Sequence, residues 1–166
     1  SLETVHFAEG SALKSIGKLA FQQCTALRSI DIPDSVTDLG AWLFSGCSSL
    51  ESVVIGASLK TINTNDFSGC SSLKTVSIGS GVESIGDSAF YKATSLETVH
   101  FAEGSALKSI GKKAFRECTA LRSIDIPDSV TDLGSRSFWG CTSLQALSLS
   151  SSCLLYTSDA ADDVIS

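Results

Sequence analysis

The residues of this chain that could carry out acid–base chemistry are two histidines, each followed at the same spacing by a serine and an aspartate. The two sets are His6, Ser29 and Asp31, and His100, Ser123 and Asp125. Serine, histidine and aspartate together can form a nucleophilic hydrolase site, but such a site also needs an oxyanion hole and a substrate pocket. We expect these side chains on a flat, exposed strand ladder. The spacing therefore favours a cross-strand polar pair over a catalytic site.

The cysteines offer a second possible chemistry, because five of the six recur at one position of a repeating phrase. They are Cys24, Cys47, Cys70, Cys118 and Cys141, and Ala93 takes the remaining slot. Alanine can replace a small buried apolar group, but it cannot replace a disulfide partner or a metal ligand. The Cys-x-x-Cys spacing of zinc sites does not occur. We predict a column of buried free thiols, with no metal and no cofactor.

Both sets owe their spacing to a repeat of 23 or 25 residues. The repeated phrase runs Leu-x-x-Ile-x-Ile, then Val-x-x-Ile-Gly, then Phe-x-x-Cys-x-x-Leu, and six copies plus the start of a seventh cover residues 1–149. The first and fifth copies carry two extra residues in a loop that reads Ala-Glu-Gly-Ser-Ala. A period of this length indicates stacked units, here called rungs, that bury apolar side chains against their neighbours.

The pattern within one rung predicts its elements. Polar and apolar residues alternate over residues 29–32, which predicts a short strand, and residues 36–40 read as a second extended piece. Residues 41–47 are predicted to form about two turns of helix. A glycine slot, filled once by Asn63, is predicted to require a left-handed conformation. The expected fold class is an α/β repeat solenoid with one to two short strands plus a short helix per rung.

The phrase Phe-x-x-Cys-[Ser/Thr]-x-Leu-x-x-Ile-x-Ile-Pro-x-x-Val-Thr-x-Ile-Gly resembles the repeat of BspA-like leucine-rich-repeat surface proteins. The resemblance covers residues 1–149. It implies a right-handed leucine-rich-repeat coil and an extracellular or cell-surface location. It also implies the binding of host proteins or of proteins on neighbouring cells, but it names no binding residue.

A duplication inside the chain predicts which columns face solvent. Residues 1–40 and 95–134 differ at only three positions, which pair Leu19 with Lys113, Gln22 with Arg116, and Gln23 with Glu117. A packed core does not tolerate exchange of leucine for lysine, so these columns are expected to be exposed.

Two sets of exposed residues are candidates for binding a protein partner. Aromatic residues in the columns that vary between the copies could be anchors, or each could cover its own rung; they are Trp42, Tyr91 and Trp139. The other set is an outward column of the long strands, formed by His6, Asp31, Val54, Ser77, His100 and Asp125.

A third column alternates in charge, which predicts a ladder of opposite charges: Glu3, Arg28, Glu51, Lys74, Glu97 and Arg122.

Composition excludes two kinds of partner. The net charge is −6 and the chain has no basic stripe, which argues against nucleic-acid binding. No stretch approaches the ~18 consecutive apolar residues of a membrane span. The chain begins at Ser1 inside a rung and contains no Met, so we expect a fragment of a longer reading frame. Rungs without caps could also associate end to end between copies.

The repeat stops after Leu149, and residues 150–166 form a non-repeat tail. Residues 153–163 resemble the in-frame translation of a sequencing adapter, so we interpret the tail as an artefact. The alternatives are a genuine polar tail and the start of another domain. For residues 1–149 the sequence favours a non-enzymatic protein-interaction module of an adhesin-like surface protein. The alternative is a passive spacer that displays another domain.

Overall fold

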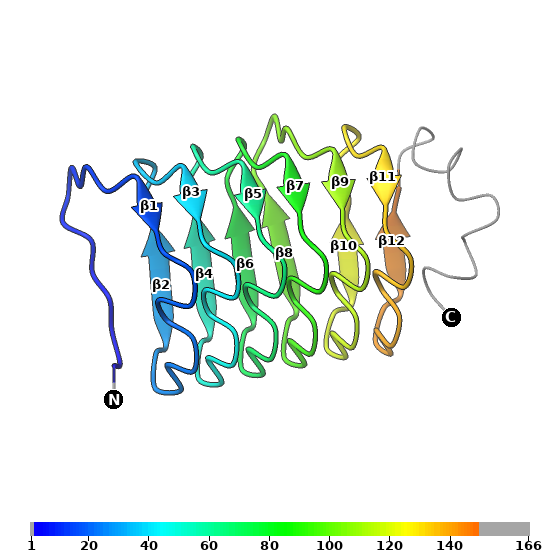
Figure 1. The fold of residues 1–166 in the computed structure, drawn as a ribbon. Helices are drawn as coiled ribbons and strands as arrows, with labels where there is room; N and C mark the ends of the chain where they lie inside the picture. The colour runs from blue at the N-terminus through cyan, green and yellow to red at the C-terminus, as the bar shows by residue number, and fades with distance from the viewer. Residues whose placement is uncertain (1, 150–166) are drawn as a thin grey trace.

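The computed structural model describes residues 2–149, which form a right-handed repeat solenoid of about six turns. One face carries the longer strands (Figure 1): β2 (Ser29–Ile32), β4 (Ser52–Ile55), β6 (Thr75–Ile78), β8 (Thr98–Phe101), β10 (Ser123–Asp125) and β12 (Ala146–Ser148). The other carries two-residue strands: β1 (Ser15–Ile16), β3 (Asp38–Leu39), β5 (Thr61–Ile62), β7 (Ser84–Ile85), β9 (Ser109–Ile110) and β11 (Asp132–Leu133). We call these the long-strand face and the short-strand face.

Neighbouring rungs pair in parallel and in register, so like residues form rows. Val53 of β4 lies between Ile30 and Val76, and all three side chains are buried. The alternate residues of each strand point to solvent, as the period of two predicted. The predicted stacking of rungs is therefore confirmed in the register of β2, β4, β6 and β8.

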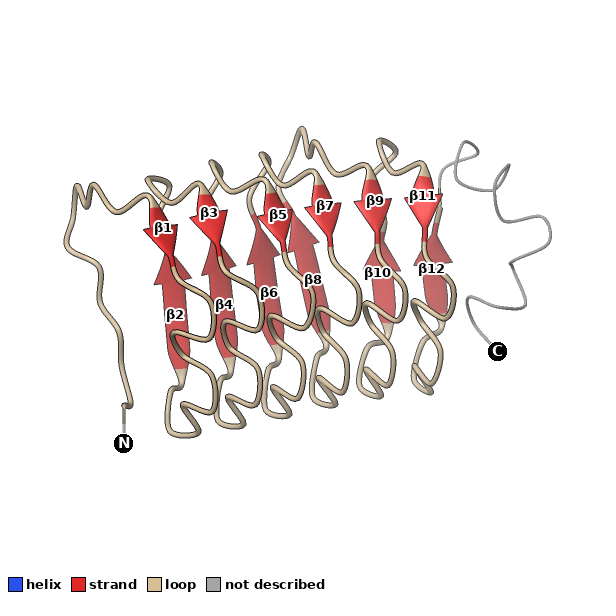
Figure 2. Ribbon diagram, viewed as in Figure 1, coloured by secondary structure: helices blue, strands red, loops and turns tan. Residues whose placement is uncertain are grey.

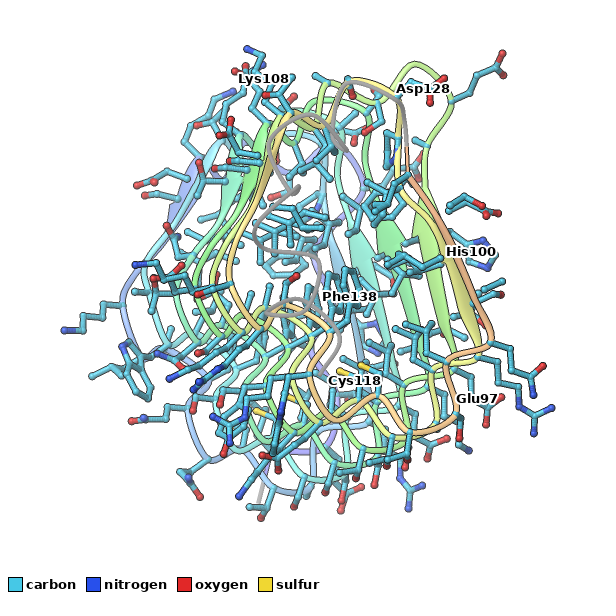
Figure 3. All side chains as sticks on the ribbon, turned by 90° about the vertical axis from the view of Figure 1, so that its right-hand side faces the viewer. Glu97, His100, Lys108, Cys118, Asp128 and Phe138 are labelled. Carbon is cyan, nitrogen blue, oxygen red and sulfur yellow. The ribbon has the colours of Figure 1, made fainter. Side chains whose placement is uncertain are left out.

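The core between the faces is a set of stacked columns, of which the phenylalanines are the most regular. Consecutive rings from Phe21 to Phe138 lie nearly parallel, with centroids 5.1 to 5.4 Å apart. In the view along the solenoid, Phe138 and Cys118 point into the interior while His100 points outward (Figure 3). Each interior ring thus buries both of its faces against the equivalent rings of its neighbours, while Phe21 and Phe138 each stack on one.

The predicted column of buried thiols is confirmed at Cys47, Cys70 and Cys118, while Cys24 and Cys141 are partly buried. Every one of these thiols except that of Cys24 donates to the carbonyl oxygen of a phenylalanine from the preceding rung, as Cys47 does to Phe21 over 3.0 Å. Burial raises the pKa of Cys47 to about 11 and that of Cys118 well above its ordinary value. These thiols therefore stay protonated at neutral pH and serve as packing groups.

The predicted helix in each rung is wrong: the described residues contain no helix, and turns fill this segment (Figure 2). Two left-handed residues interrupt each such segment, for example Leu19 (φ 65°) and Gln23 (φ 59°). Alternate N–H groups also donate to the next rung, as Phe44 does to Asp66 over 2.9 Å. An α-helix would need these donors for its own carbonyls, and the bonds between rungs use them instead.

The predicted left-handed conformation of the glycine slot is also wrong, because the slot glycines have no positive φ. The slot favours glycine for a steric reason, because a side chain there would meet the backbone of the preceding rung. A Cβ on Gly86 would lie 2.6 Å from the backbone nitrogen of Thr64 in the preceding rung. The left-handed residue comes two positions later, at Ser88 with φ 56°.

The short-strand face is interrupted at the one slot that holds asparagine. The backbone N–H of Gly86 donates to Ile62 over 2.7 Å, whereas Asn63 reaches Leu39 through its side-chain amide. Consequently β3 and β5 are not paired as strands, and the face divides into β1–β3 and β5–β7–β9–β11.

The long-strand face is interrupted elsewhere, between β8 and β10. This position follows the fifth rung, which carries the two additional loop residues. In the first rung, which has the same strand and loop sequence, only the isolated bridge between Thr4 and Ser29 joins the next strand. The longer rung therefore matches the next strand less well.

The interpretation of residues 150–166 as an artefact lies outside the described residues.

Candidate functional site

The predicted outward column of the long-strand face is exposed at every position except Ser77, which is partly buried. Direct register places Asp31 beside Val54, Val54 beside Ser77, and Ser77 beside His100. The side chain of Val54 is 45% exposed, so an apolar side chain stands among the polar members of this column. The inward neighbours in the same strands are uniformly apolar, so the scaffold is constant while the surface it displays varies from rung to rung.

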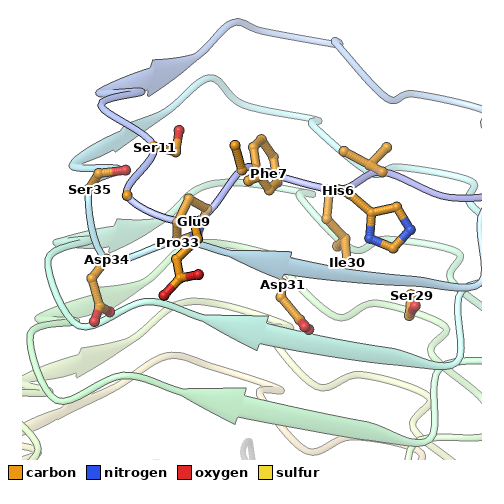
Figure 4. Close-up of a pocket in the computed structure, with 13 residues that line it drawn as sticks. His6, Phe7, Glu9, Ser11, Ser29, Ile30, Asp31, Pro33, Asp34 and Ser35 are labelled. Atoms are coloured by element: carbon orange, nitrogen blue, oxygen red, sulfur yellow. The ribbon is translucent and has the colours of Figure 1, made fainter.

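The two histidines stand in this column without firm partners. Asp31 projects from β2 below His6 (Figure 4), and no hydrogen bond or ion pair joins the two among the described residues. The same holds for His100 and Asp125. The predicted cross-strand pairs are therefore not bonded, and β8 and β10, which carry His100 and Asp125, are not paired as strands. The histidines remain free to meet a partner.

Two crevices open at the edge of this column, and they are copies of each other. The first, of about 430 Å³, lies between residues 8–11 and the turn 33–35. The second, of about 550 Å³, lies between residues 102–105 and the turn 127–129. Each separates a long loop from the turn of the following rung. The sequence indicated where these crevices form, because only the first and fifth rungs have the longer loop.

The predicted aromatic anchors occupy the turns on the other side of the coil. Trp42 is 39% and Trp139 is 36% exposed, so these two side chains face solvent, but Ser45 in the column of Trp139 is buried. The guanidinium of Arg116 lies 4.5 Å from the ring centroid of Trp139 and 5.5 Å from that of Tyr91. Tyr91 and Trp139 are therefore engaged with Arg116 in a cation–π stack, and Trp42 stands apart from it.

Charged columns directly precede the strands of both faces, Glu51 before β4 and Glu83 before β7. Glu51 lies 3.5 Å from both Arg28 and Lys74, so part of the predicted alternating ladder is present. A second set, missed from the sequence, places Glu83 between Lys60 at 3.2 Å and Lys108 at 2.9 Å. Hydrogen bonds from Lys108 and Lys60 lower the pKa of Glu83 below its ordinary value. These exposed pairs help to hold adjacent rungs in register.

One buried carboxylate was also missed. Asp66 is fully buried and accepts hydrogen bonds from the backbone N–H groups of Asn63 (2.7 Å) and Leu43 (3.2 Å). Burial raises its pKa from 3.8 to about 6, although the backbone donors oppose that shift. The available signal was a single acidic residue in a column whose members in other rungs are alanine, leucine or serine.

Among residues 2–149 no catalytic constellation of side chains is formed, because His6 and His100 make no hydrogen bond to a serine or an aspartate. Within residues 2–149, no three His, Cys, Asp or Glu side chains gather as a metal site would require. The same stretch holds no helix of the length and apolarity needed to cross a membrane.

Comparison with known proteins points to a single family. The model of the BspA type leucine rich repeat region (6 copies) matches residues 1–106 and 103–161. No curated protein matches the chain. A leucine-rich repeat protein from Eubacterium ventriosum is 32% identical, with a TM-score of 0.77, and the match covers 85% of this chain and 37% of that one.

Two further solved structures are similar. A leucine rich cell surface protein from Faecalibacterium prausnitzii is 30% identical with a TM-score of 0.60, and the match covers 84% of this chain and 44% of that one. The pneumococcal vaccine antigen PcpA shares the fold at 23% identity and a TM-score of 0.61, over 88% of this chain and 44% of that one. This chain thus spans less than half the length of each of these proteins. From its repeat phrase, its stacked rungs and the family match, the chain belongs to the BspA type leucine-rich repeat family.

Proposed function

We propose that this chain is a non-enzymatic protein-interaction module of an extracellular, adhesin-like surface protein, and that it binds host or neighbouring-cell proteins through the long-strand face. The observation that carries the proposal is the contrast within each long strand. Inward positions repeat the same apolar types, while the outward column changes from histidine to aspartate, valine and serine. Solenoids use such extended surfaces for recognition, with a constant scaffold beneath a varied face.

Family membership supports the location and the class of activity. The similar protein from Faecalibacterium prausnitzii is described as a cell surface protein. An exposed apolar side chain among polar neighbours, such as Val54, supplies the desolvated contact that interfaces use as an anchor.

The proposal is tested with two matched lysine substitutions, Val54→Lys and Leu19→Lys. Val54 and Leu19 are 45% and 43% exposed, and they lie on the long-strand face and on the turns respectively. Purified chain is immobilised and probed with a panel of extracellular-matrix and epithelial surface proteins. We expect at least one saturable interaction, which Val54→Lys weakens about tenfold or more and Leu19→Lys leaves nearly unchanged.

Circular dichroism of both variants verifies that the fold is retained. Loss of binding in Leu19→Lys alone would place the interface at the turns near Trp42 and overturn the assignment to the long-strand face. Saturable binding to none of the probes would instead support a passive spacer that displays another domain.

A further inference from the structure

The two crevices share one origin and most of their lining. Phe7, Asp31 and Asp34 in the first correspond to Phe101, Asp125 and Asp128 in the second, while His6 and Glu9 line the first alone and Ser148 the second alone. The duplication therefore provides the same recess twice on one solenoid. At ~4.8 Å per rung, four rungs place the two crevices ~19 Å apart.

Backbone geometry explains why the recess forms at these two places. The longer loop turns back on itself, with Ser11 N–H donating to Ala8 over 3.0 Å and Ser105 N–H to Ala102 over 3.1 Å. At both places the strand ladder to the next rung is incomplete. The loop consequently stands away from the following turn, while β2, β4 and β6 of the 23-residue rungs each pair in register with the next strand.

The lining of the crevices is acidic and partly apolar. The first is lined by Glu9, Asp31 and Asp34, and neither crevice is lined by any lysine or arginine. Phe7 and Phe101 are only partly buried, so each crevice has an aromatic side to its floor. Figure 4 shows Glu9, Asp31, Asp34 and Phe7 among the residues that line the first crevice.

One polar atom of the first crevice lacks a partner. The hydroxyl oxygen of Ser35 is buried and makes no hydrogen bond, whereas its equivalent Ser129 donates to Ser105 over 3.1 Å. A buried hydroxyl without a partner is costly, and a ligand group entering the crevice would satisfy it.

We infer that each crevice receives a lysine or arginine side chain of an extended protein segment, and that the pair binds one partner carrying two such segments ~19 Å apart. This inference rests on the proposed function and names the chemistry of its partner. The aliphatic stem of the basic side chain packs on the phenylalanine, and its charged end meets the aspartates at the rim. Duplication then adds avidity, since the second contact becomes intramolecular.

The test uses a labelled synthetic peptide with two Lys-Leu-Lys modules joined by a Gly/Ser spacer of about six residues, which spans ~20 Å when extended. The peptide with one module and the peptide with glutamate in place of lysine are the probes for comparison. Binding to the full chain is measured by fluorescence anisotropy at low and at physiological ionic strength, because screening weakens exposed charge pairs.

The variants are Asp31→Asn with Asp125→Asn, and the matched control Asp38→Asn with Asp132→Asn. Both double variants remove two carboxylates at equivalent positions of the two copies, but Asp38 and Asp132 lie in β3 and β11 on the short-strand face. We expect the two-module peptide to bind about tenfold more tightly than the single module. We expect the crevice variant to weaken binding about tenfold and the control less than about twofold.

Equal weakening by both double variants would show general charge attraction and overturn the inference, as would equal affinity for the one-module and two-module peptides. Equal binding of the glutamate peptide would overturn it too. These failures are separable from failure of the proposed function. A protein partner sensitive to Val54→Lys, found while the lysine peptide does not bind, would uphold the function and reject the crevices.

Discussion

The two duplicated segments, residues 1–40 and 95–134, have nearly the same sequence and very different environments. Leu13 is 38% exposed, while its equivalent Leu107 is fully buried. Phe21 and Cys24 are partly buried, while Phe115 and Cys118 are fully buried. The first segment begins at a rung with one described neighbour, and the second at a rung with two. Burial in this fold therefore depends on the adjacent rungs, not on the residues of a rung alone.

The largest effect that could break this comparison is truncation of the stacked phenylalanines. We expect Phe115→Ala to lower the free energy of unfolding by about 3–5 kcal/mol, because it leaves a cavity between two rings. Phe21→Ala removes a partly buried ring and should cost about 1–2 kcal/mol. Urea denaturation of both variants measures the difference. Equal losses would show that neighbouring rungs do not determine the contribution of a ring.

The third rung sharpens the comparison, because it is an interior rung with a buried carboxylate, Asp66, that neither copy has. The folded pKa of Asp66 is about 6 and its ordinary value is 3.8. The folded state thus binds the proton more tightly, and this contribution to stability is complete below about pH 4 and is lost as the pH rises through about 6. Between about pH 4 and about pH 6, the free energy of unfolding of the wild type should fall by about 1–3 kcal/mol relative to that of Asp66→Asn.

That difference is obtained from denaturant unfolding of the wild type and Asp66→Asn at a series of pH values. Other carboxylates are common to both proteins, so their contributions cancel in the difference. A difference that does not change with pH would show that Asp66 titrates at its ordinary value, and that its hydrogen bonds to Leu43 and Asn63 compensate for burial.

A smaller effect concerns a position where the copies differ. Arg116→Gln gives the fifth rung the residue that the first rung has at Gln22. It removes the cation stacked between Tyr91 and Trp139, and we expect a loss of about 0.5–1 kcal/mol. A double-mutant cycle with Trp139→Ala isolates the interaction. A coupling energy near zero would show that the stack contributes nothing.

The smallest expected effect is that of Leu19→Lys, which converts the first copy to the residue of the second. Both side chains occupy an exposed left-handed position, with φ of 65° at Leu19 and 57° at Lys113. The free energy of unfolding should change by less than about 0.5 kcal/mol. A larger loss in thermal or urea denaturation would mean that Leu19 covers its rung.

The candidate site was only partly predictable. The exposed columns, the buried thiols and the solvent-facing aromatics follow from periodicity and from the differences between the copies. The crevices depend on a longer rung failing to match its neighbour, and the Arg116 stack depends on three rungs meeting in space. Which outward residues bind a partner stays a prediction from the sequence.

By itself the sequence determined the coil, its period and the side chains that face inward, because a repeat of apolar residues leaves one way to bury them. Only the tertiary structure decided how the backbone between those residues bonds. In the turn segments, alternate N–H groups donate to carbonyl oxygens of the adjacent rung and not to carbonyls of a helix. On the short-strand face, Asn63 separates β3 from β5. These choices depend on a neighbour ~4.8 Å away in space but more than twenty residues away in sequence, which local patterns do not encode.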